Sequence, residues 1–245
     1  MALVHEFEKS GNWLFKRRSW LPLILLAAGI FAMYFTNRQA IIFNLKEELL
    51  FLGVSLLGQA IRVFTVGHAP KNTSGRNTEA GQVAEELNVT GIYSQVRHPL
   101  YIGNFFMWLG PVLFLRSAVF TGFFVLIYWL YYERIMFAEE QFLRRKFGDT
   151  YDNWSGTVSS VIPKFRDYVK PLLPFSLRSV LKREHNSFVN IFMVFLLLDL
   201  IRNYFLSERL YITSLWIYLS AGAGFLWFIT WVAHKKTTWL EVPGR

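Results

Sequence analysis

The stretch that decides the fold runs from residue 99 to residue 137 and reads PLYIGNFFMWLGPVLFLRSAVFTGFFVLIYWLYYERIMF. It holds two apolar runs, 100–115 and 117–137, and the chain passes from one to the other through Arg-Ser-Ala at 116–118. Each run approaches the roughly 20 residues that an α-helix, rising about 1.5 Å per residue, needs to cross a bilayer. A connection this short predicts that the two runs form a tight helical hairpin, 100–137.

Four further apolar runs flank the hairpin, at 20–35, 48–66, 188–206 and 210–233. The chain of 245 residues is 53% hydrophobic and 18% aromatic but only 18% charged, which is too apolar for an ordinary soluble domain. We therefore predict an all-α fold, a polytopic membrane helix bundle with about six transmembrane helices, in one integral membrane domain spanning 1–245. The first run follows Lys-Arg-Arg as a signal peptide would, but it lacks a clear small-residue cleavage site, so we expect a retained helix.

The net charge of +9 comes from basic residues in short segments beside the apolar runs, where they set membrane orientation. Nucleic-acid binding requires an exposed basic face instead, and we predict no nucleic-acid partner. Nineteen Lys and Arg residues fall on one side of the six-span arrangement and four on the other, namely Arg38, Lys46, Arg116 and Arg209. The positive-inside rule then predicts cytoplasmic termini and cytoplasmic loops at 67–99 and 138–187, and an inner or plasma membrane location if the protein is bacterial.

The residue types also exclude some chemistry. The chain has no Cys, which rules out disulfides, thiolate metal sites and Cys nucleophiles. Its His residues are scattered along the sequence, and we predict no metal site.

Polar residues precede the hairpin in the segment GIYSQVRHPLYIGNF, 91–105. Pro99 suits the first turn of a helix, where its missing N–H costs nothing, so Arg97 and His98 are expected at the N-terminal mouth of that helix. Unpaired backbone N–H groups, the helix dipole and an Arg guanidinium all favour an anionic ligand there. The alternative is that Arg97 and His98 only anchor the helix among lipid headgroups.

Acidic residues follow the hairpin in the segment YYERIMFAEEQFLRRKFGDTYDNW, 131–154. Glu133, Glu139 and Glu140 lie at or just beyond the end of the second run, where unpaired carboxylates are costly. At about 100° per residue, Glu133 and Glu140 share one helix face and Glu139 points elsewhere. The alternative is an amphipathic exit helix whose acids pair with neighbouring Arg side chains. Because the hairpin places the basic mouth beside this acidic end, we predict a pocket for a ligand carrying both signs of charge.

These motifs together resemble the isoprenylcysteine carboxyl methyltransferase and phospholipid methyltransferase superfamily of integral membrane methyltransferases. The resemblance rests on GIYSQVRHPLYIGN (91–104), EEQFLRRKFGDTYDNW (139–154), VIP (161–163) and the upstream IRVFTVG (61–67). It covers about 50–165, which we regard as a methyltransferase-like core. The N-terminal span 20–35 and a two-span C-terminal extension, 166–245, lie outside it.

The resemblance implies that S-adenosylmethionine binds in a cytosol-facing pocket and that a lipid acceptor enters from the bilayer. The implied partners are therefore membrane lipids or a lipidated acceptor, with the oligomeric state open. The motif positions imply these cofactor-binding residues: Gly91, Tyr93, Arg97, His98, Tyr101, Gly103, Glu139 and Glu140. The implied catalytic residues are Arg97, His98 and Arg62.

The roles follow from the same resemblance. Glu139 and Glu140 would hold the cationic or ribose groups of the cofactor, and Arg62 would either orient an acceptor carboxylate or phosphate or pair with a Glu of the site. Methyl transfer from a sulfonium depends mainly on alignment and on exclusion of water. A carboxylate acceptor needs no base, whereas an amine or hydroxyl acceptor needs one, and His98 or a Glu is the candidate.

Two other functions share parts of this pattern. Sterol and steroid reductases have a similar Arg-His-Pro-containing membrane fold and would use a nicotinamide cofactor such as NADPH. A scaffold or transporter would account for the spans and the charge bias but would leave the polar cluster without a role. We predict methyl transfer because the Glu-Glu-x-x-Leu and Phe-Gly-x-x-Tyr motifs resemble the methyltransferases more closely.

The extension 166–245 carries its own expectations. Asp199 and Arg202 are spaced i,i+3 in the fifth run, and we expect them to pair. The segment 175–188 is expected to form a basic interfacial helix capped by Ser176. Because the motifs end before this region, the fifth and sixth spans are expected to shape acceptor access or assembly without contacting the cofactor.

Overall fold

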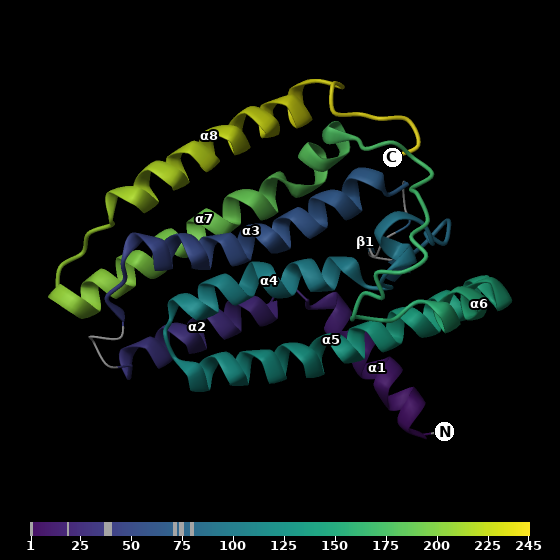
Figure 1. Cartoon of the computed structure of the whole chain (residues 1–245), viewed down its shortest axis with the longest axis horizontal. Helices are drawn as coiled ribbons and strands as arrows, with labels where there is room; N and C mark the ends of the chain where they lie inside the picture. Colours follow the sequence, from purple (N-terminus) through teal and green to yellow (C-terminus); the bar gives the residue numbers. More distant parts are fainter. Residues whose placement is uncertain (1, 19, 37–40, 71–72, 74–75, 79–80) are drawn as a thin grey trace.

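Each of the six predicted apolar runs corresponds to a helix in the computed structural model, although the sixth run begins four residues before its helix (Figure 1). The structure describes residues 2–18, 20–36, 41–70, 73, 76–78 and 81–245. The prediction of an all-α membrane helix bundle is confirmed. The corresponding helices are α2 (Trp20–Tyr34), α3 (Leu45–His68), α4 (Pro99–Phe114), α5 (Ala118–Phe147), α7 (Leu177–Ser207) and α8 (Ser214–Lys236).

Three of these helices, α3, α7 and α8, are long and apolar enough to cross a membrane, while α2 and α4 are apolar but shorter. The N- and C-termini lie at the same end of the bundle (Figure 1), as an even number of crossings requires. That end also carries the start of α4, and we call it the motif end and the opposite one the distal end. Arg38, which entered the charge count, lies outside the described residues.

The predicted hairpin is formed by α4 and α5. Arg116 turns the chain with a positive φ of 53°, and the Ser117 hydroxyl caps α5 by accepting from the Phe120 N–H at 3.2 Å. However, α5 continues ten residues beyond the predicted boundary at 137, to Phe147, where Gly148 (φ 51°) begins the short helix α6 (Asp149–Thr157). This extension holds Glu139 and Glu140 on a rigid helix beside the mouth of α4.

Close contact between α3 and α4 depends on residues without bulky side chains. A Cβ added at Gly58 would lie 2.3 Å from the Gly103 carbonyl oxygen, and one added at Gly110 would lie 2.4 Å from the Phe51 carbonyl oxygen. Such close backbone approach is the usual role of small residues in membrane helix packing. It fixes α4 against α3, and with it the position of the motif residues.

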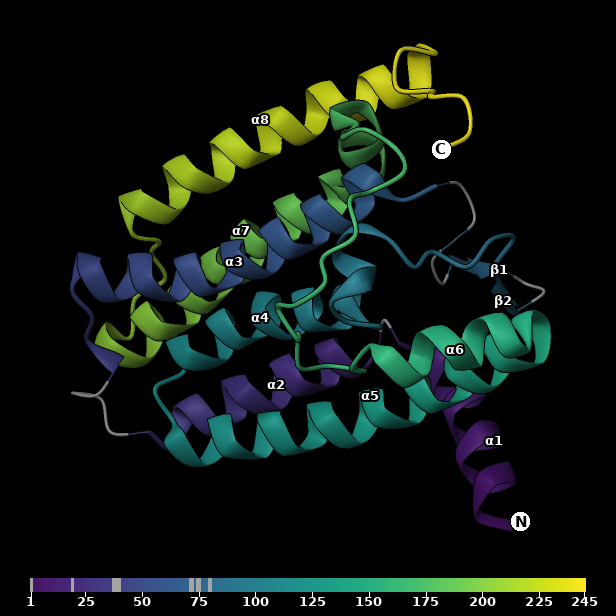
Figure 2. The same cartoon turned by 45° about the vertical axis from the view of Figure 1, so that its right-hand side comes forward.

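A helix that the sequence analysis did not predict, α1 (Ala2–Lys16), crosses the end of α5 (Figure 2). Its Gly11 packs so tightly that an added Cβ would lie 2.0 Å from the Arg134 carbonyl oxygen. The Arg134 guanidinium lies 3.5 Å from the centre of the Phe7 ring. This docking braces the part of α5 that carries the acidic motif.

The other regular elements are short, and the basic segment before the fifth apolar run forms part of a long helix. Strands β1 (Arg76–Thr78) and β2 (Gly81–Val83) form an antiparallel hairpin, and a 3-10 turn, η2 (Gly91–Ser94), precedes α4. The predicted Ser176 cap is confirmed, because its hydroxyl accepts from the Ser179 N–H at 3.3 Å. The basic segment 175–188 is not a separate interfacial helix, since α7 runs unbroken from Leu177 through the fifth apolar run.

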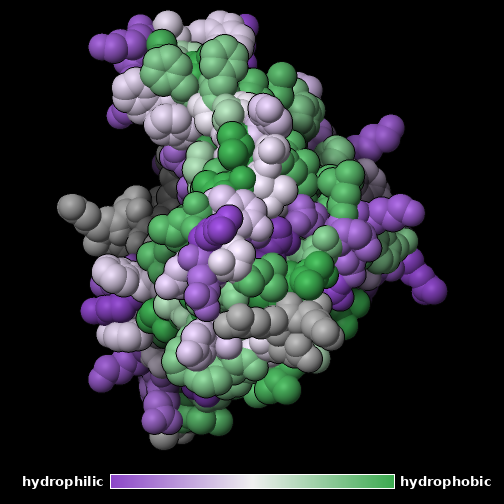
Figure 3. Space-filling view, turned by 90° about the vertical axis from the view of Figure 1, so that its left-hand side faces the viewer, coloured by the Kyte–Doolittle hydropathy of each residue, from purple (hydrophilic) through white to green (hydrophobic). Residues whose placement is uncertain are grey.

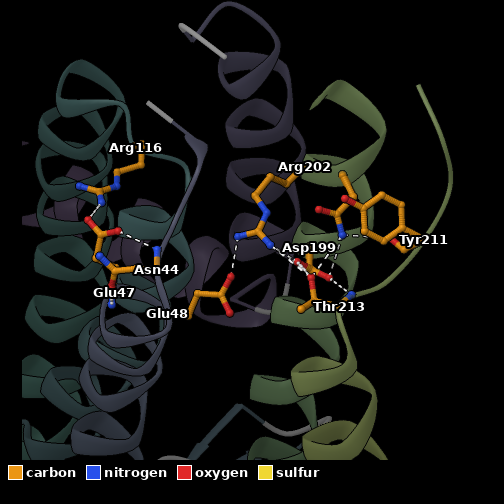
Figure 4. A network of polar contacts seen from close by, with 9 residues as sticks. Asn44, Glu47, Glu48, Arg116, Asp199, Arg202, Tyr211 and Thr213 are labelled. Atoms are coloured by element: carbon orange, nitrogen blue, oxygen red, sulfur yellow. Dashed lines mark hydrogen bonds and ion pairs between the residues drawn. The ribbon is translucent and has the colours of Figure 1, made fainter. Parts of the chain in front are cut away.

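At the distal end, a buried ionic network joins α3, α7 and the loop before α8 (Figure 4). Arg202 donates to Glu48 at 2.7 Å and pairs with Asp199, as the i,i+3 spacing predicted. Asp199 also accepts from the Thr213 N–H at 2.6 Å. On the surface of this end, hydrophilic residues lie among hydrophobic ones (Figure 3).

Candidate functional site

The mouth of α4 is held in place by backbone hydrogen bonds from the loop that follows α6. The N–H groups of Arg97 and His98 donate to the carbonyls of Ser159 and Ser160 at 2.9 and 3.1 Å. Gly91 opens η2 with a φ of 61°, a conformation that favours glycine. The two hydrogen bonds and the Gly91 turn together fix the backbone that carries the predicted site residues.

The Arg97 side chain links three elements. Its Nε donates to Glu140 Oε1 at 3.0 Å, and its Nη1 donates to the carbonyls of Ser155 and Val158, at 2.6 and 3.0 Å, at the end of α6. The Arg97 guanidinium thus has partners within the protein and also lies on the wall of the cavity described below. It ties α4 to α5 and α6.

His98 lies between the two motif glutamates. Its Nε2 is 3.0 Å from Glu140 Oε1 and its Nδ1 is 3.8 Å from Glu139 Oε2. Burial acts to raise the pKa of the Glu140 carboxyl, but the hydrogen bonds and charges of His98 and Arg97 outweigh it, so the pKa lies below its usual value. Glu140 is thus ionised near neutral pH, which makes His98 Nε2 the donor toward it.

Glu139 is held separately, because the Tyr101 hydroxyl donates to its Oε2 at 2.8 Å. The Tyr101 ring stacks on His98 with 5.6 Å between ring centres. The two glutamates thus face motif residues of α4. The alternative was an exit helix whose acids pair with Arg144, Arg145 and Arg134. It does not describe Glu139 and Glu140, because Arg144 pairs with Asp152, Arg145 pairs with Glu8 and Arg134 lies over the Phe7 ring.

Arg62 occupies the α3 side of the site and pairs with a carboxylate from the C-terminal extension. Its Nε and Nη2 each lie 2.8 Å from an oxygen of Glu184, and its Nη1 donates to Asn104 Oδ1 at 2.6 Å. From the sequence, Arg62 was expected either to orient an acceptor carboxylate or phosphate or to pair with a Glu of the site. The structure shows Arg62 paired with a Glu. The partner lies 122 residues away, on α7.

A cavity of about 730 Å³ lies among these groups. Six of the predicted site residues line it: Arg62, Tyr93, Arg97, His98, Tyr101 and Glu139. Further polar and aromatic residues that the sequence analysis did not select also line it: Arg18, Asn104, Tyr151, Trp154, Lys182, Arg183, Glu184 and His234. The wall therefore combines both signs of charge with flat aromatic rings.

Three predicted site residues lie outside this wall. Glu140 lies behind it, bonded to Arg97 and His98. Gly103 faces α3, where an added Cβ would meet the Arg62 side chain at 2.6 Å, and Gly91 serves the turn before α4. The motif glycines thus have packing and backbone roles.

Residues of the extension line the cavity from positions just outside the predicted fifth and sixth spans, 188–206 and 210–233. The expectation that those spans do not contact the cofactor stays a prediction. Lys182, Arg183 and Glu184 come from the first turns of α7, and His234 comes from the last turn of α8. The run Lys-Arg-Glu-His at 182–185, just before a span of apolar residues, was the available sequence signal. It was interpreted only as a membrane-surface segment.

A second hollow, about 410 Å³ and almost entirely apolar, lies against the α4–α5 hairpin. Phe105, Phe106, Val125 and Trp129 line it together with the loop residues Val161, Ile162 and Pro163. His98 and Tyr101 line both this groove and the polar cavity. A polar and an apolar compartment thus share these two side chains.

Known proteins match the region that contains the nine site residues predicted from the sequence. Residues 49–150 match the phospholipid methyltransferase family. Over 113 residues the chain is 35% identical to a protein-S-isoprenylcysteine O-methyltransferase of Schizosaccharomyces pombe, covering 46% of this chain and 48% of the relative. It is 30% identical over 111 residues to the protein of the same name from Saccharomyces cerevisiae, covering 44% and 45%.

A probable protein-S-isoprenylcysteine O-methyltransferase of Oryza sativa subsp. indica is 28% identical over 139 residues, which cover 54% of this chain and 72% of the relative. No solved structure matches. The chain spans about half the length of the two yeast relatives. In the core that holds the motif residues of α4 and α5 at the cavity, this chain is similar to phospholipid methyltransferases and to protein-S-isoprenylcysteine O-methyltransferases.

Proposed function

We propose that this protein transfers a methyl group from S-adenosylmethionine to a lipid or lipidated acceptor in the membrane. The observation that carries the proposal is the shared wall of the two compartments, because His98 and Tyr101 border both the polar cavity and the apolar groove. A polar cofactor and an apolar acceptor would meet there with little water between them.

The residues of the cavity fit the cofactor. Glu139 suits a cationic group, and Lys182 suits a carboxylate. Tyr93 and Trp154 present flat rings for a purine, with the Trp154 indole N–H held by the Tyr93 carbonyl at 3.2 Å. The bound cofactor would supply a methyl group activated on a sulfonium.

The chain itself mainly orients and excludes water. Arg97 holds Glu140 and the end of α6, which keeps His98 in a fixed position between Glu139 and Glu140. A carboxylate acceptor would need nothing further from His98. An amine or hydroxyl acceptor would require a base. His98 in its neutral form, with the proton on Nε2 donated to Glu140, would take the acceptor's proton at Nδ1.

We further propose that the motif end faces the cytoplasm, with both termini there, and that a bacterial form lies in the inner or plasma membrane. The excess of basic residues on that side supports this orientation. A single cysteine at Thr150, in a chain without other Cys, should be labelled only from the cytoplasmic side. Labelling from the outside would show that the motif end has the opposite orientation.

Equilibrium binding to the purified protein in nanodiscs tests the function. Saturable binding of S-adenosylmethionine without binding of NADPH is expected. Binding of NADPH alone would favour a reductase of the type considered from sequence, and binding of neither would favour a scaffold. The relatives named above are methyltransferases, which supports the first outcome.

A further inference from the structure

The loop that follows α6 carries an unusual row of exposed apolar residues. It reads VIPKFRDYVKPLLPF, 161–175. Ile162, Phe165 and Leu172 are 78%, 84% and 82% exposed, and Tyr168 and Val169 are also exposed. Large apolar side chains in such a row mark an interaction surface, because single exposed residues are ordinary but contiguous ones are not.

This loop is held rigidly to the ends of the spans. The Lys164 N–H donates to the Gln95 carbonyl at 3.3 Å, and the Gln95 side chain donates to the Arg166 carbonyl at 2.9 Å. Further along, the Gly91 N–H donates to the Val169 carbonyl and the Ser176 N–H to the Gly67 carbonyl, both at 2.9 Å. These bonds fix the loop at the level where α3 ends and α4 begins.

Both ends of the loop continue apolar surfaces of the helices. Ile162 and its neighbours line the groove of the α4–α5 hairpin beside Phe106 and Val125. At the other end, the Phe175 ring lies 6.4 Å from the ring of Phe64, which is itself 61% exposed on α3. The row thus bridges two apolar surfaces of the helix bundle.

The exposed Phe165 also has an energetically unfavourable backbone conformation. Phe165 has a φ of 51°, in the left-handed region that large side chains rarely adopt. The bonds to buried Gln95 hold this conformation. Exposed Lys164, Arg166 and Lys170 alternate with the apolar residues, against a single acid, Asp167. Apolar and basic residues in alternation complement an anionic lipid surface.

We infer that the 161–175 loop inserts its apolar side chains into the headgroup and upper acyl region of the bilayer and binds anionic lipid through its basic residues. The loop is then a membrane-embedded rim of the motif end, next to the apolar groove. This role does not depend on methyl transfer, and it would hold for any activity of the cavity.

Single cysteines in this Cys-free chain test the inference in nanodiscs that contain phosphatidylcholine and phosphatidylglycerol. The variants are Phe165→Cys and Leu172→Cys on the loop, Asn153→Cys on exposed α6 as the aqueous control, and Leu126→Cys on α5 as the hydrocarbon control. Folding of each variant is checked by thermal unfolding. We expect both loop cysteines to react with a water-soluble maleimide at least tenfold more slowly than Asn153→Cys.

A fluorophore attached to the loop cysteines should also be quenched by lipids spin-labelled near the headgroup, more strongly than one on Asn153→Cys. Adding the substitutions Lys164→Gln, Arg166→Gln and Lys170→Gln should remove the dependence of this quenching on phosphatidylglycerol. Reaction as fast as at Asn153→Cys would overturn the inference. Slow reaction without lipid quenching would overturn it too, because it would mean that a protein surface, such as a second copy, covers the loop.

Discussion

The two ends of the bundle hold similar chemistry in different settings. At the distal end, Glu48, Asp199 and Arg202 form a buried network that borders none of the cavities described above. At the motif end, Glu140 joins Arg97 and His98, and His98 also lies near Glu139. Three members of this network, Arg97, His98 and Glu139, lie on the wall of a large cavity. Ion pairs inside a membrane protein are therefore not sufficient to identify a site. The adjoining cavity is what gives the motif-end network access to a ligand.

The largest expected effect is on stability and belongs to the distal end. Arg202→Gln would leave Glu48 and Asp199 buried without their cation, and we expect it to destabilise the protein by about 3–5 kcal/mol. Thermal unfolding in detergent measures the loss, and adding Asp199→Asn should restore part of it. Affinity for S-adenosylmethionine in the folded fraction should stay within about threefold.

Arg116→Gln is the matched control, because Arg116 forms a partly exposed ion pair with Glu47 at the same end. Such pairs contribute less than about 1 kcal/mol. If Arg202→Gln strongly weakened cofactor binding in folded protein, the claim that the distal network affects only stability would be wrong.

A smaller effect, on affinity, belongs to the motif end. Glu139→Gln removes the charge on the cavity wall but keeps an acceptor for the Tyr101 hydroxyl. We expect S-adenosylmethionine to bind about tenfold more weakly, or about 1.4 kcal/mol, with little change in unfolding temperature. Glu133→Gln, on the same helix but outside the cavity wall, should bind as the parent does.

Glu140 lies behind that wall, so its effect should appear mainly as a pH-dependent stability. Its pKa is lowered in the folded protein, so its contribution is present above the unfolded pKa of about 4.3 and disappears as the pH falls through the folded value. Glu140→Gln should therefore unfold at a lower temperature than the parent at pH 7. The difference should shrink below about pH 4. A constant difference across that range would assign Glu140 another role.

The smallest effect is expected at Gly91, which sequence reasoning placed in the ligand site. Its φ of 61° makes Gly91→Ala unfavourable by about 1 kcal/mol. Calorimetry should detect this loss, whereas cofactor affinity should not change. A loss of cofactor affinity without a loss of stability would indicate that Gly91 contacts the ligand.

These differences show which parts of the molecule the sequence could predict. The hairpin followed from the shortness of the Arg116–Ala118 connection, and the pairing of Asp199 with Arg202 followed from helical spacing. Both depend on neighbours in the chain. Local pattern was equally sufficient for the Ser176 cap.

Features that depend on tertiary contact were missed. The α1 helix has mixed polarity, and its docking depends on Gly11 meeting the Arg134 backbone. The partner of Arg62, Glu184, lies 122 residues away and beyond the resemblance to known methyltransferases. Gly103 was assigned to ligand binding because a motif names residues without showing which way each one faces.

The central claim is that methyl transfer occurs where the polar cavity meets the apolar groove. The most direct test is Val125→Trp, which places a bulky ring in the groove on the α5 side, away from the polar cavity. Transfer of a tritiated methyl group from S-adenosylmethionine to nanodisc lipids and to an added prenylcysteine analogue is compared with cofactor affinity in the same variant. We predict at least a tenfold loss of transfer with affinity within about threefold of the parent. Unchanged transfer, or an equal loss of both, would contradict the account.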